Sequence, residues 1–482
     1  MIPSNVRWRI VGLLLAFSFM SWFNRVSMAV AYDEQIKADL GISEAAMGGV
    51  YSAFLIAYMV CMTPGGWLAD RFGPWLALVV MGFGSALFGI VTGSVNLMAQ
   101  TANQVLFLFL IVRTTMGVFT APIYPASTRI VSYWIPFHQR AMVNGLIMAA
   151  ALVGIACSFQ IFGLLLDWVR WPLAFTITGT FTGILAILWT WYGKDHPGQH
   201  RHVNPAEEHW IAQTPPERGS AEAPERASVG APDCDEHITS APALLRSRAP
   251  ALPQDHEEHI TSAAALLRSR APALLPSHSL WRNRSLIFLT LSYAAVGYFE
   301  YLFYFWIHYY FEDVLHLGKD RSRWFATISN LAMAVGMASG GWMSDRLQRV
   351  YGYRLGRALV PVGGMLAGAA LLGLGLLAEE PNWIVVWFAL AMAAVGATEG
   401  PFWATAIDLG GRHGATSAGI FNTGGNAGGA VAPLLTPIVS EACGWEWGIG
   451  LGSLICLAGV CFWWWIDPGS PPTPSASLHR AS

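Results

Sequence analysis

Five charged side chains lie well inside long apolar runs of this sequence, namely Arg25, Arg113, Glu300, Glu399 and Asp408. A charge at the centre of a lipid bilayer costs about 3 kcal/mol or more, so such a side chain faces a partner or a water-filled cavity. A planar guanidinium binds a carboxylate through two parallel hydrogen bonds. The two arginines therefore predict a positive pocket for a small anion, and the buried carboxyl groups are candidates for carrying a proton.

The same charges also allow a purely structural arrangement. Arg25 and Arg113 can instead pair with Glu300 or Glu399 inside the protein. The two arrangements are compatible if an incoming carboxylate competes for the pair. We favour binding of an anion by the two arginines, and the sequence alone also allows the structural ion pairs.

The apolar runs that contain these charges indicate a membrane protein. Hydrophobic residues make up 54% of the chain and charged residues only 12%, whereas soluble proteins carry about 25% charged residues. A membrane-spanning helix needs about 20 apolar residues. Twelve segments qualify: 8–32, 45–69, 74–96, 104–131, 140–164, 171–193, 285–311, 324–346, 357–378, 383–408, 414–440 and 446–466.

These spans predict four regions of the chain. Six spans fill 1–193, a polar segment occupies 194–284, six more spans fill 285–467, and 468–482 forms a tail. The polar segment contains a tandem duplication, EHITSAPALLRSRAPAL followed by EHITSAAALLRSRAPAL. Two copies are too few for a solenoid, so we expect a largely disordered linker. Arginines gather in alternate short loops, which predicts that both termini and the linker are cytoplasmic.

A second repeat relates the two sets of spans. GGWLADR at 65–71 recurs as GGWMSDR at 340–346, and GVFTAP at 117–122 parallels GATEGP at 396–401. Two parallel six-helix repeats are typical of transporters that bind their cargo between two rocking halves. The sequence therefore predicts an all-α membrane protein with twelve transmembrane helices in two pseudo-symmetric six-helix bundles, working by alternating access.

The repeated motifs and one further acid are candidates for gates. The glycines allow close helix approach, and Asp70, Arg71, Asp345 and Arg346 are expected to bridge to neighbouring helices and close one face. Asp408, near the end of its span, is expected to act similarly, together with Arg412.

These motifs resemble the major facilitator superfamily, and in more detail its anion:cation symporter family. The finer resemblance lies in WFNRVSMAV at 22–30, in 113–140 and in GIFNTGGN at 419–426. It implies a small carboxylate as the substrate, contacts to it from Arg25 and Arg113, and a lining role for Tyr58. It also implies a bacterial inner (plasma) membrane as the location.

The chain departs from that family at both usual proton sites. Asn24 stands where the symporters carry Asp, and Thr120 stands where they carry Glu. Neither side chain titrates in the working range. The repeat makes Glu399 the counterpart of Thr120, and Glu300 shares a helix face with Tyr304. We therefore expect Glu300 or Glu399 to couple transport to protons, with a permanent ion pair as the alternative.

The remaining candidate contacts are uncharged. Asn422 and Asn426 are four residues apart on one helix face, so their amides can line a cavity or instead join helices. Asn24, Thr120 and Tyr304 complete the expected substrate contacts.

The sequence also limits the classes of function. We expect no catalytic residues, no metal, no cofactor and no nucleic-acid partner, since no cluster of nucleophile, base or ligand side chains is apparent. The expected partners are a small carboxylate, a proton and the lipid bilayer, and the chain is expected to be a monomer. Two alternatives stay open: an uncoupled facilitator of the same substrates, and a non-transporting membrane sensor that signals through its long linker.

Overall fold

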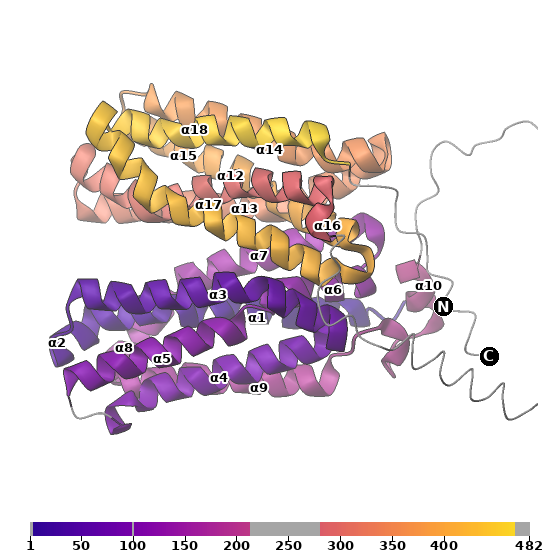
Figure 1. Cartoon of the computed structure of the whole chain (residues 1–482), viewed down its shortest axis with the longest axis horizontal. Helices are drawn as coiled ribbons and strands as arrows, with labels where there is room; N and C mark the ends of the chain where they lie inside the picture. Colours follow the sequence, from indigo (N-terminus) through magenta and orange to yellow (C-terminus); the bar gives the residue numbers. More distant parts are fainter. Residues whose placement is uncertain (1–2, 99–100, 213–279, 468–482) are drawn as a thin grey trace, which may run out of the picture. The chain divides into compact units, whose positions relative to one another are not determined.

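The computed structural model describes residues 3–98, 101–212 and 280–467, which are helical and contain no β-strand (Figure 1). The N-terminal half is formed by α1 (Val6–Ala31), α3 (Glu44–Phe72), α4 (Pro74–Met98), α5 (Ala102–Thr120), α6 (Ile123–Trp134), α7 (Arg140–Cys157), α8 (Gly163–Trp168) and α9 (Trp171–Tyr192). The C-terminal half is formed by α12 (Arg284–Tyr309), α13 (Lys319–Tyr351), α14 (Tyr353–Leu376), α15 (Pro381–Gly396), α16 (Glu399–Gly410), α17 (Gly414–Cys443) and α18 (Trp445–Phe462).

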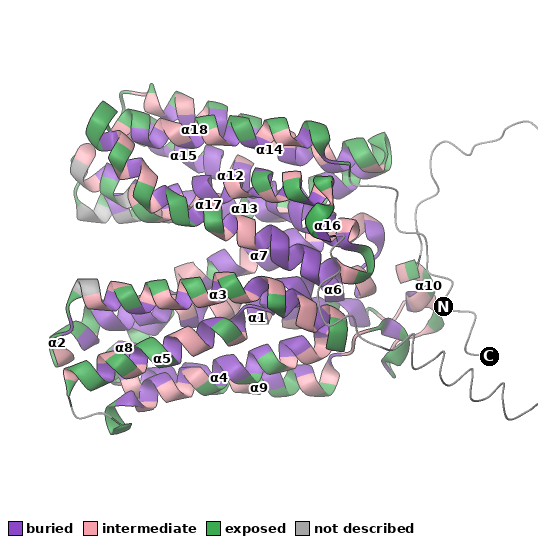
Figure 2. Cartoon of the chain, viewed as in Figure 1, coloured by how far each residue is buried: buried purple, intermediate pink, exposed green. Residues whose placement is uncertain are grey.

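The predicted twelve-span, all-α architecture is confirmed. Within the described residues, ten segments are long and apolar enough to cross a membrane. One of them, Pro381–Cys443, holds both the tenth and the eleventh predicted spans, and the eighth predicted span is α13, which is less hydrophobic than the others. Exposed residues recur along outer helices such as α18, where apolar side chains face the bilayer (Figure 2).

The fourth and tenth spans are both interrupted within the repeated motif, the tenth three residues earlier in the alignment. α5 gives way to α6 at Ala121 and Pro122, and α15 gives way to α16 at Ala397 and Thr398. Proline lacks a backbone N–H and disturbs the helical ladder, and Pro122 and Pro401 occupy corresponding positions of the repeat. The second interruption places Glu399 in the first turn of α16.

Glycines of the repeated motifs allow helices of opposite halves to touch. A Cβ atom at Gly66 would lie 2.2 Å from the carbonyl oxygen of Ala415, and one at Gly341 would lie 2.3 Å from that of Ala141. α6 and α7 also pack against α17 and α16, at the end of the bundle where α10 and the N-terminus lie (Figure 1). Small residues at these crossings bring the two backbones close together.

The first part of the predicted linker is ordered. Its helix α10 (Pro205–Ala212) carries the fully buried Glu207, which accepts hydrogen bonds of 3.1 Å from the backbone N–H groups of Val6 and Arg7. Glu207 thereby satisfies free donors at the start of α1. The duplicated segments 236–252 and 258–274 and the tail 468–482 lie outside the described residues.

Candidate functional site

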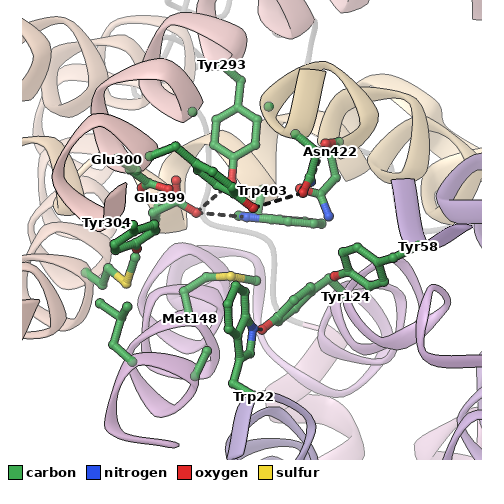
Figure 3. Close-up of a pocket in the computed structure, with 17 residues that line it drawn as sticks. Trp22, Tyr58, Tyr124, Met148, Tyr293, Glu300, Tyr304, Glu399, Trp403 and Asn422 are labelled. Atoms are coloured by element: carbon green, nitrogen blue, oxygen red, sulfur yellow. Dashed lines mark hydrogen bonds between the residues drawn. The ribbon is translucent and has the colours of Figure 1, made fainter. Parts of the chain in front are cut away.

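A cavity lies between the two halves and holds about 590 Å³ of empty space, including the part open to solvent. Its polar and aromatic lining comes from α1, α3, α6, α12, α16 and α17 (Figure 3): Trp22, Tyr58, Tyr124, Tyr293, Glu300, Tyr301, Tyr304, Glu399, Trp403, Asn422 and Asn426.

A pair of carboxyl groups occupies the C-terminal side of this cavity. Glu399 is only 2% exposed, and its Oε2 accepts hydrogen bonds from the Tyr293 hydroxyl at 2.9 Å and the Trp403 indole at 3.1 Å (Figure 3). Glu300 lies beside it, and the two carboxyl groups interact directly. The Oε1 atom of each is buried without a hydrogen-bond partner among the described residues. One proton shared between the two contacting carboxyl groups would give such an oxygen a donor.

Arg25 is positioned on the N-terminal side by aromatic rings. Its guanidinium carbon lies 4.2 Å from the ring centre of Trp22, 5.3 Å from that of Phe54 and 5.4 Å from that of Tyr58. Trp22 and Tyr58 themselves line the cavity. Ring faces attract a cation without neutralising it, and the described part of the chain contains no ion pair to Arg25. Arg25 is half-buried and is not itself a lining residue, so it borders the cavity only through the rings of Trp22 and Tyr58.

Arg113 is more deeply buried, at 3% exposed. One terminal nitrogen donates to the backbone oxygen of Asn24 at 3.3 Å, while the other has no partner in the described structure. The predicted structural alternative, in which Arg25 or Arg113 pairs with Glu300 or Glu399, does not occur among the ion pairs of the described residues. Arg113 is not part of the cavity lining.

An aromatic bridge connects the two charged sides. The Trp22 indole donates to the Tyr124 hydroxyl, and the Tyr124 ring centre lies 5.6 Å from that of Trp403. Tyr124 is within electrostatic reach of both Arg25 and Glu399. The cationic and acidic groups are thus separated by rings rather than paired.

The structure separates the predicted contact residues into two groups. Tyr58, Tyr304, Asn422 and Asn426 line the cavity, whereas Asn24 and Thr120 do not. The Asn24 amide donates to Thr182 at 2.8 Å, and the Thr120 hydroxyl donates to the Met116 carbonyl at 2.7 Å. Asn24 and Thr120 therefore serve helix packing in this structure.

Several lining residues were missed at the level of sequence, among them Trp22, Tyr124, Tyr301 and Trp403. Two of them carried a usable signal. Trp22 lies three residues before Arg25 and Trp403 lies four residues after Glu399, so each shares a helix face with a residue that was predicted.

One junction between the halves is centred on Asp70, at the end of α3. Asp70 accepts hydrogen bonds from the backbone N–H groups of Ala415 at 3.0 Å and Thr416 at 2.6 Å, at the start of α17. Arg129 lies 3.6 Å from Asp70 and donates to the Gly411 carbonyl at 2.6 Å. A carboxylate at a helix N-terminus is stabilised by the free N–H groups and the helix dipole.

The pseudo-symmetric junction is centred on Asp345, in the last two turns of α13. Asp345 accepts from the backbone N–H groups of Ala141 at 3.3 Å and Met142 at 2.8 Å, at the start of α7. Arg357 contacts it at 3.4 Å. The two repeated aspartates thus cap a helix of the opposite half in equivalent ways.

Asp408 belongs to the second junction. It lies 3.4 Å from Arg140 and 3.5 Å from Arg357, and it accepts a hydrogen bond of 3.0 Å from the Tyr353 hydroxyl. The expected pairing with Arg412 is wrong, because Arg140 and Arg357 occupy that role.

The arginines of the repeated motifs do not reach the junctions. Arg71 and Arg346 are exposed, and their guanidinium carbons lie 5.7 Å and 6.0 Å from the ring centres of Phe72 and Trp342. The prediction that each Asp and the adjacent Arg act together is corrected, since arginines of other helices meet the aspartates.

The architecture and the cavity between two repeated halves define a membrane carrier. Residues 13–421 match the family model described as Major Facilitator Superfamily. This chain belongs to the major facilitator superfamily and is a multi-pass membrane transporter rather than an enzyme.

Named relatives cover nearly the whole chain. A probable sulfoacetate transporter of Cupriavidus necator is 23% identical over 441 residues, covering 91% of this chain and 89% of that protein. A D-galactonate transporter of Escherichia coli is 25% identical over 465 residues, covering 95% of each. The solved structure of the proton:xylose symporter bound to 6-bromo-6-deoxy-D-glucose superimposes with a TM-score of 0.65 at 12% identity, covering 99% of this chain and 100% of that one. That likeness concerns the fold.

Proposed function

We propose that this protein is a secondary transporter of a small organic anion, which binds between the two halves with its carboxylate at Arg25. The observation that carries the proposal is the position of Arg25, held by the lining residues Trp22 and Tyr58 with no acidic partner in the described part of the chain. Relatives named as galactonate and sulfoacetate transporters support the substrate class. Arg113 supplies a second positive charge behind the site.

The transport cycle in this proposal is alternating access. Asp70, Asp345 and Asp408 hold the halves together at the end of the bundle where α10 and the N-terminus lie. Opening the cavity on that side requires these contacts to break, so we assign them to a gate. The proposal places both termini in the cytoplasm and a monomeric protein in the cell's inner membrane.

The substrate class is tested with purified full-length protein in liposomes. We expect labelled galactonate to enter loaded liposomes by counterflow, because Arg25, which has no acidic partner in the described structure, offers a positive charge to its carboxylate. Galactitol, which lacks the carboxylate, is the neutral control and is expected to enter no faster than into protein-free liposomes. Equal entry of galactitol and galactonate would contradict the proposal.

We further propose that the Glu300 and Glu399 pair is the proton site. Two like charges in contact repel, so one shared proton stabilises the pair, and movement of the halves can change its access to water. The described residues place no cationic side chain in contact with the pair. The groups that face it are Tyr124, Tyr293, Tyr304, Trp403 and Cys456.

Glu399→Gln and Glu300→Gln are expected to reduce uptake driven by an imposed pH gradient to the level without a gradient. Counterflow at equal pH is expected to persist, because it needs no net proton movement. The measurement compares both assays in the same liposomes, with the exposed Glu446→Gln as the control. If both variants retain full gradient-driven uptake, the pair is not the proton site.

A further inference from the structure

The cavity is electrically polarised between its two halves. The N-terminal half contributes Arg25 through its contact with the lining rings, and the C-terminal half contributes Glu300 and Glu399. Tyr124 is close enough to both Arg25 and Glu399 to interact electrostatically with each of them. A ligand in this cavity therefore lies between two aromatic rings that hold a cation, on one side, and an acidic pair that lines the cavity, on the other.

Two carboxyl oxygens on the acidic side of the cavity have no hydrogen-bond donor in the described structure. Glu399 Oε1 and Glu300 Oε1 have no partner among the described groups although both atoms are buried. A carboxylate oxygen only accepts hydrogen bonds, and a buried acceptor left without a donor is unfavourable. A pair that shares one proton also keeps one negative charge, which one ammonium group would balance.

The rings on the acidic side favour a cation as well. Tyr301 and Tyr304 line the cavity beside Glu300, with ring centres 5.5 Å apart in an edge-to-face arrangement, and Trp403 holds Glu399. Aromatic faces attract cations through their quadrupole. On the acidic side of the cavity, the aromatic rings and the acidic pair thus both favour the binding of a cation.

We propose that the transported solute is a zwitterion, with its carboxylate at Arg25 and a protonated amine at Glu300 and Glu399. This inference rests on the proposed function and specifies the substrate class. A polyhydroxy acid supplies donors but no charge to balance the pair. A dicarboxylate would place its second carboxylate against two acids, where like charges repel. Only a solute with opposite charges at its two ends satisfies both sides at once.

The test uses three four-carbon probes that differ only at one end: 4-aminobutanoate, 4-hydroxybutanoate and succinate. Uptake of each is measured in liposomes that contain the full-length protein. We expect 4-aminobutanoate to be preferred over 4-hydroxybutanoate by roughly tenfold or more, because the ammonium forms charge-assisted hydrogen bonds. In Glu300→Gln this preference is expected to disappear, while Glu300→Asp, which keeps the charge, retains most of it.

Thermal stabilisation by 4-hydroxybutanoate is measured in every variant, which shows that a loss of preference is not a loss of folding. Arg25-dependent uptake of 4-hydroxybutanoate or succinate equal to that of 4-aminobutanoate would overturn the zwitterion and leave anion transport standing. Uptake of galactonate with none of the three probes would overturn it too. If no carboxylate of any kind enters, the proposed function itself fails.

Discussion

Arg25→Ala is expected to reduce carboxylate uptake roughly a hundredfold or more, because the substrate carboxylate loses two charge-assisted hydrogen bonds worth about 1.5–3 kcal/mol each. The fold should tolerate the change, since Arg25 contacts rings and has no ion pair within the described structure. The measurement is the initial rate of counterflow at matched amounts of reconstituted protein.

Two matched variants make this result specific. Arg25→Lys keeps the charge but loses the planar two-pronged donor, so its uptake is expected to lie between the wild type and Arg25→Ala. Arg9→Ala removes an exposed arginine of the same helix and should leave uptake unchanged. A substitution of Arg113 would be a less specific test, because Arg113 also donates a hydrogen bond to the backbone oxygen of Asn24. Uptake by Arg25→Ala within about twofold of the wild type would contradict anion capture at this residue.

The fold followed from sequence because a bilayer leaves few alternatives: every backbone polar group in a span must be satisfied within helices. Most spans are visible as apolar runs of sufficient length. α13 is the exception, since its hydropathy does not qualify it as a span. Its segment 324–346 was nevertheless counted among the twelve apolar runs, and the repeat of GGWLADR as GGWMSDR supported that count, because the second copy ends a helix equivalent to α3.

The gate residues show where local patterns fail. Asp70 and Arg71 are neighbours in sequence, but adjacent residues of a helix point in directions about 100° apart. Asp70 faces the start of α17, so Arg71 faces outward. Its place is taken by Arg129 from α6, a partner that no spacing within the motif could reveal.

The part of the site that consists of buried charged side chains could be predicted from the sequence. Glu300 and Glu399 had to face a cavity or a partner, and they line the cavity next to one another. Thr120 was expected there because the family resemblance makes it the counterpart of a glutamate of the symporters, but its hydroxyl turns to the Met116 carbonyl and to Ser85 at 3.3 Å. The Thr120 hydroxyl donates to a backbone carbonyl of its own helix, whereas Glu399 accepts from Tyr293 of α12 as well as from Trp403 of its own helix. The two equivalent positions therefore have different surroundings.

Arg357→Met is expected to destabilise the protein by about 3–5 kcal/mol, because it leaves two buried carboxylates without their shared cation. Arg357 is completely buried and lies 3.4 Å from Asp345 and 3.5 Å from Asp408. The measurement is the apparent unfolding temperature of the purified protein together with a denaturant titration.

Arg354→Met is the matched control, one helical turn away on α14, because its ion pair with Asp467 is 4.0 Å long and exposed. Its effect should stay below about 1 kcal/mol. Adding Asp345→Asn to Arg357→Met removes one of the stranded charges and should restore part of the stability. Equal stability of the Arg357→Met and Arg354→Met variants would show that Asp345 and Asp408 are neutralised without Arg357. In that case backbone capping alone would hold this junction, and opening it would require no separation of charge.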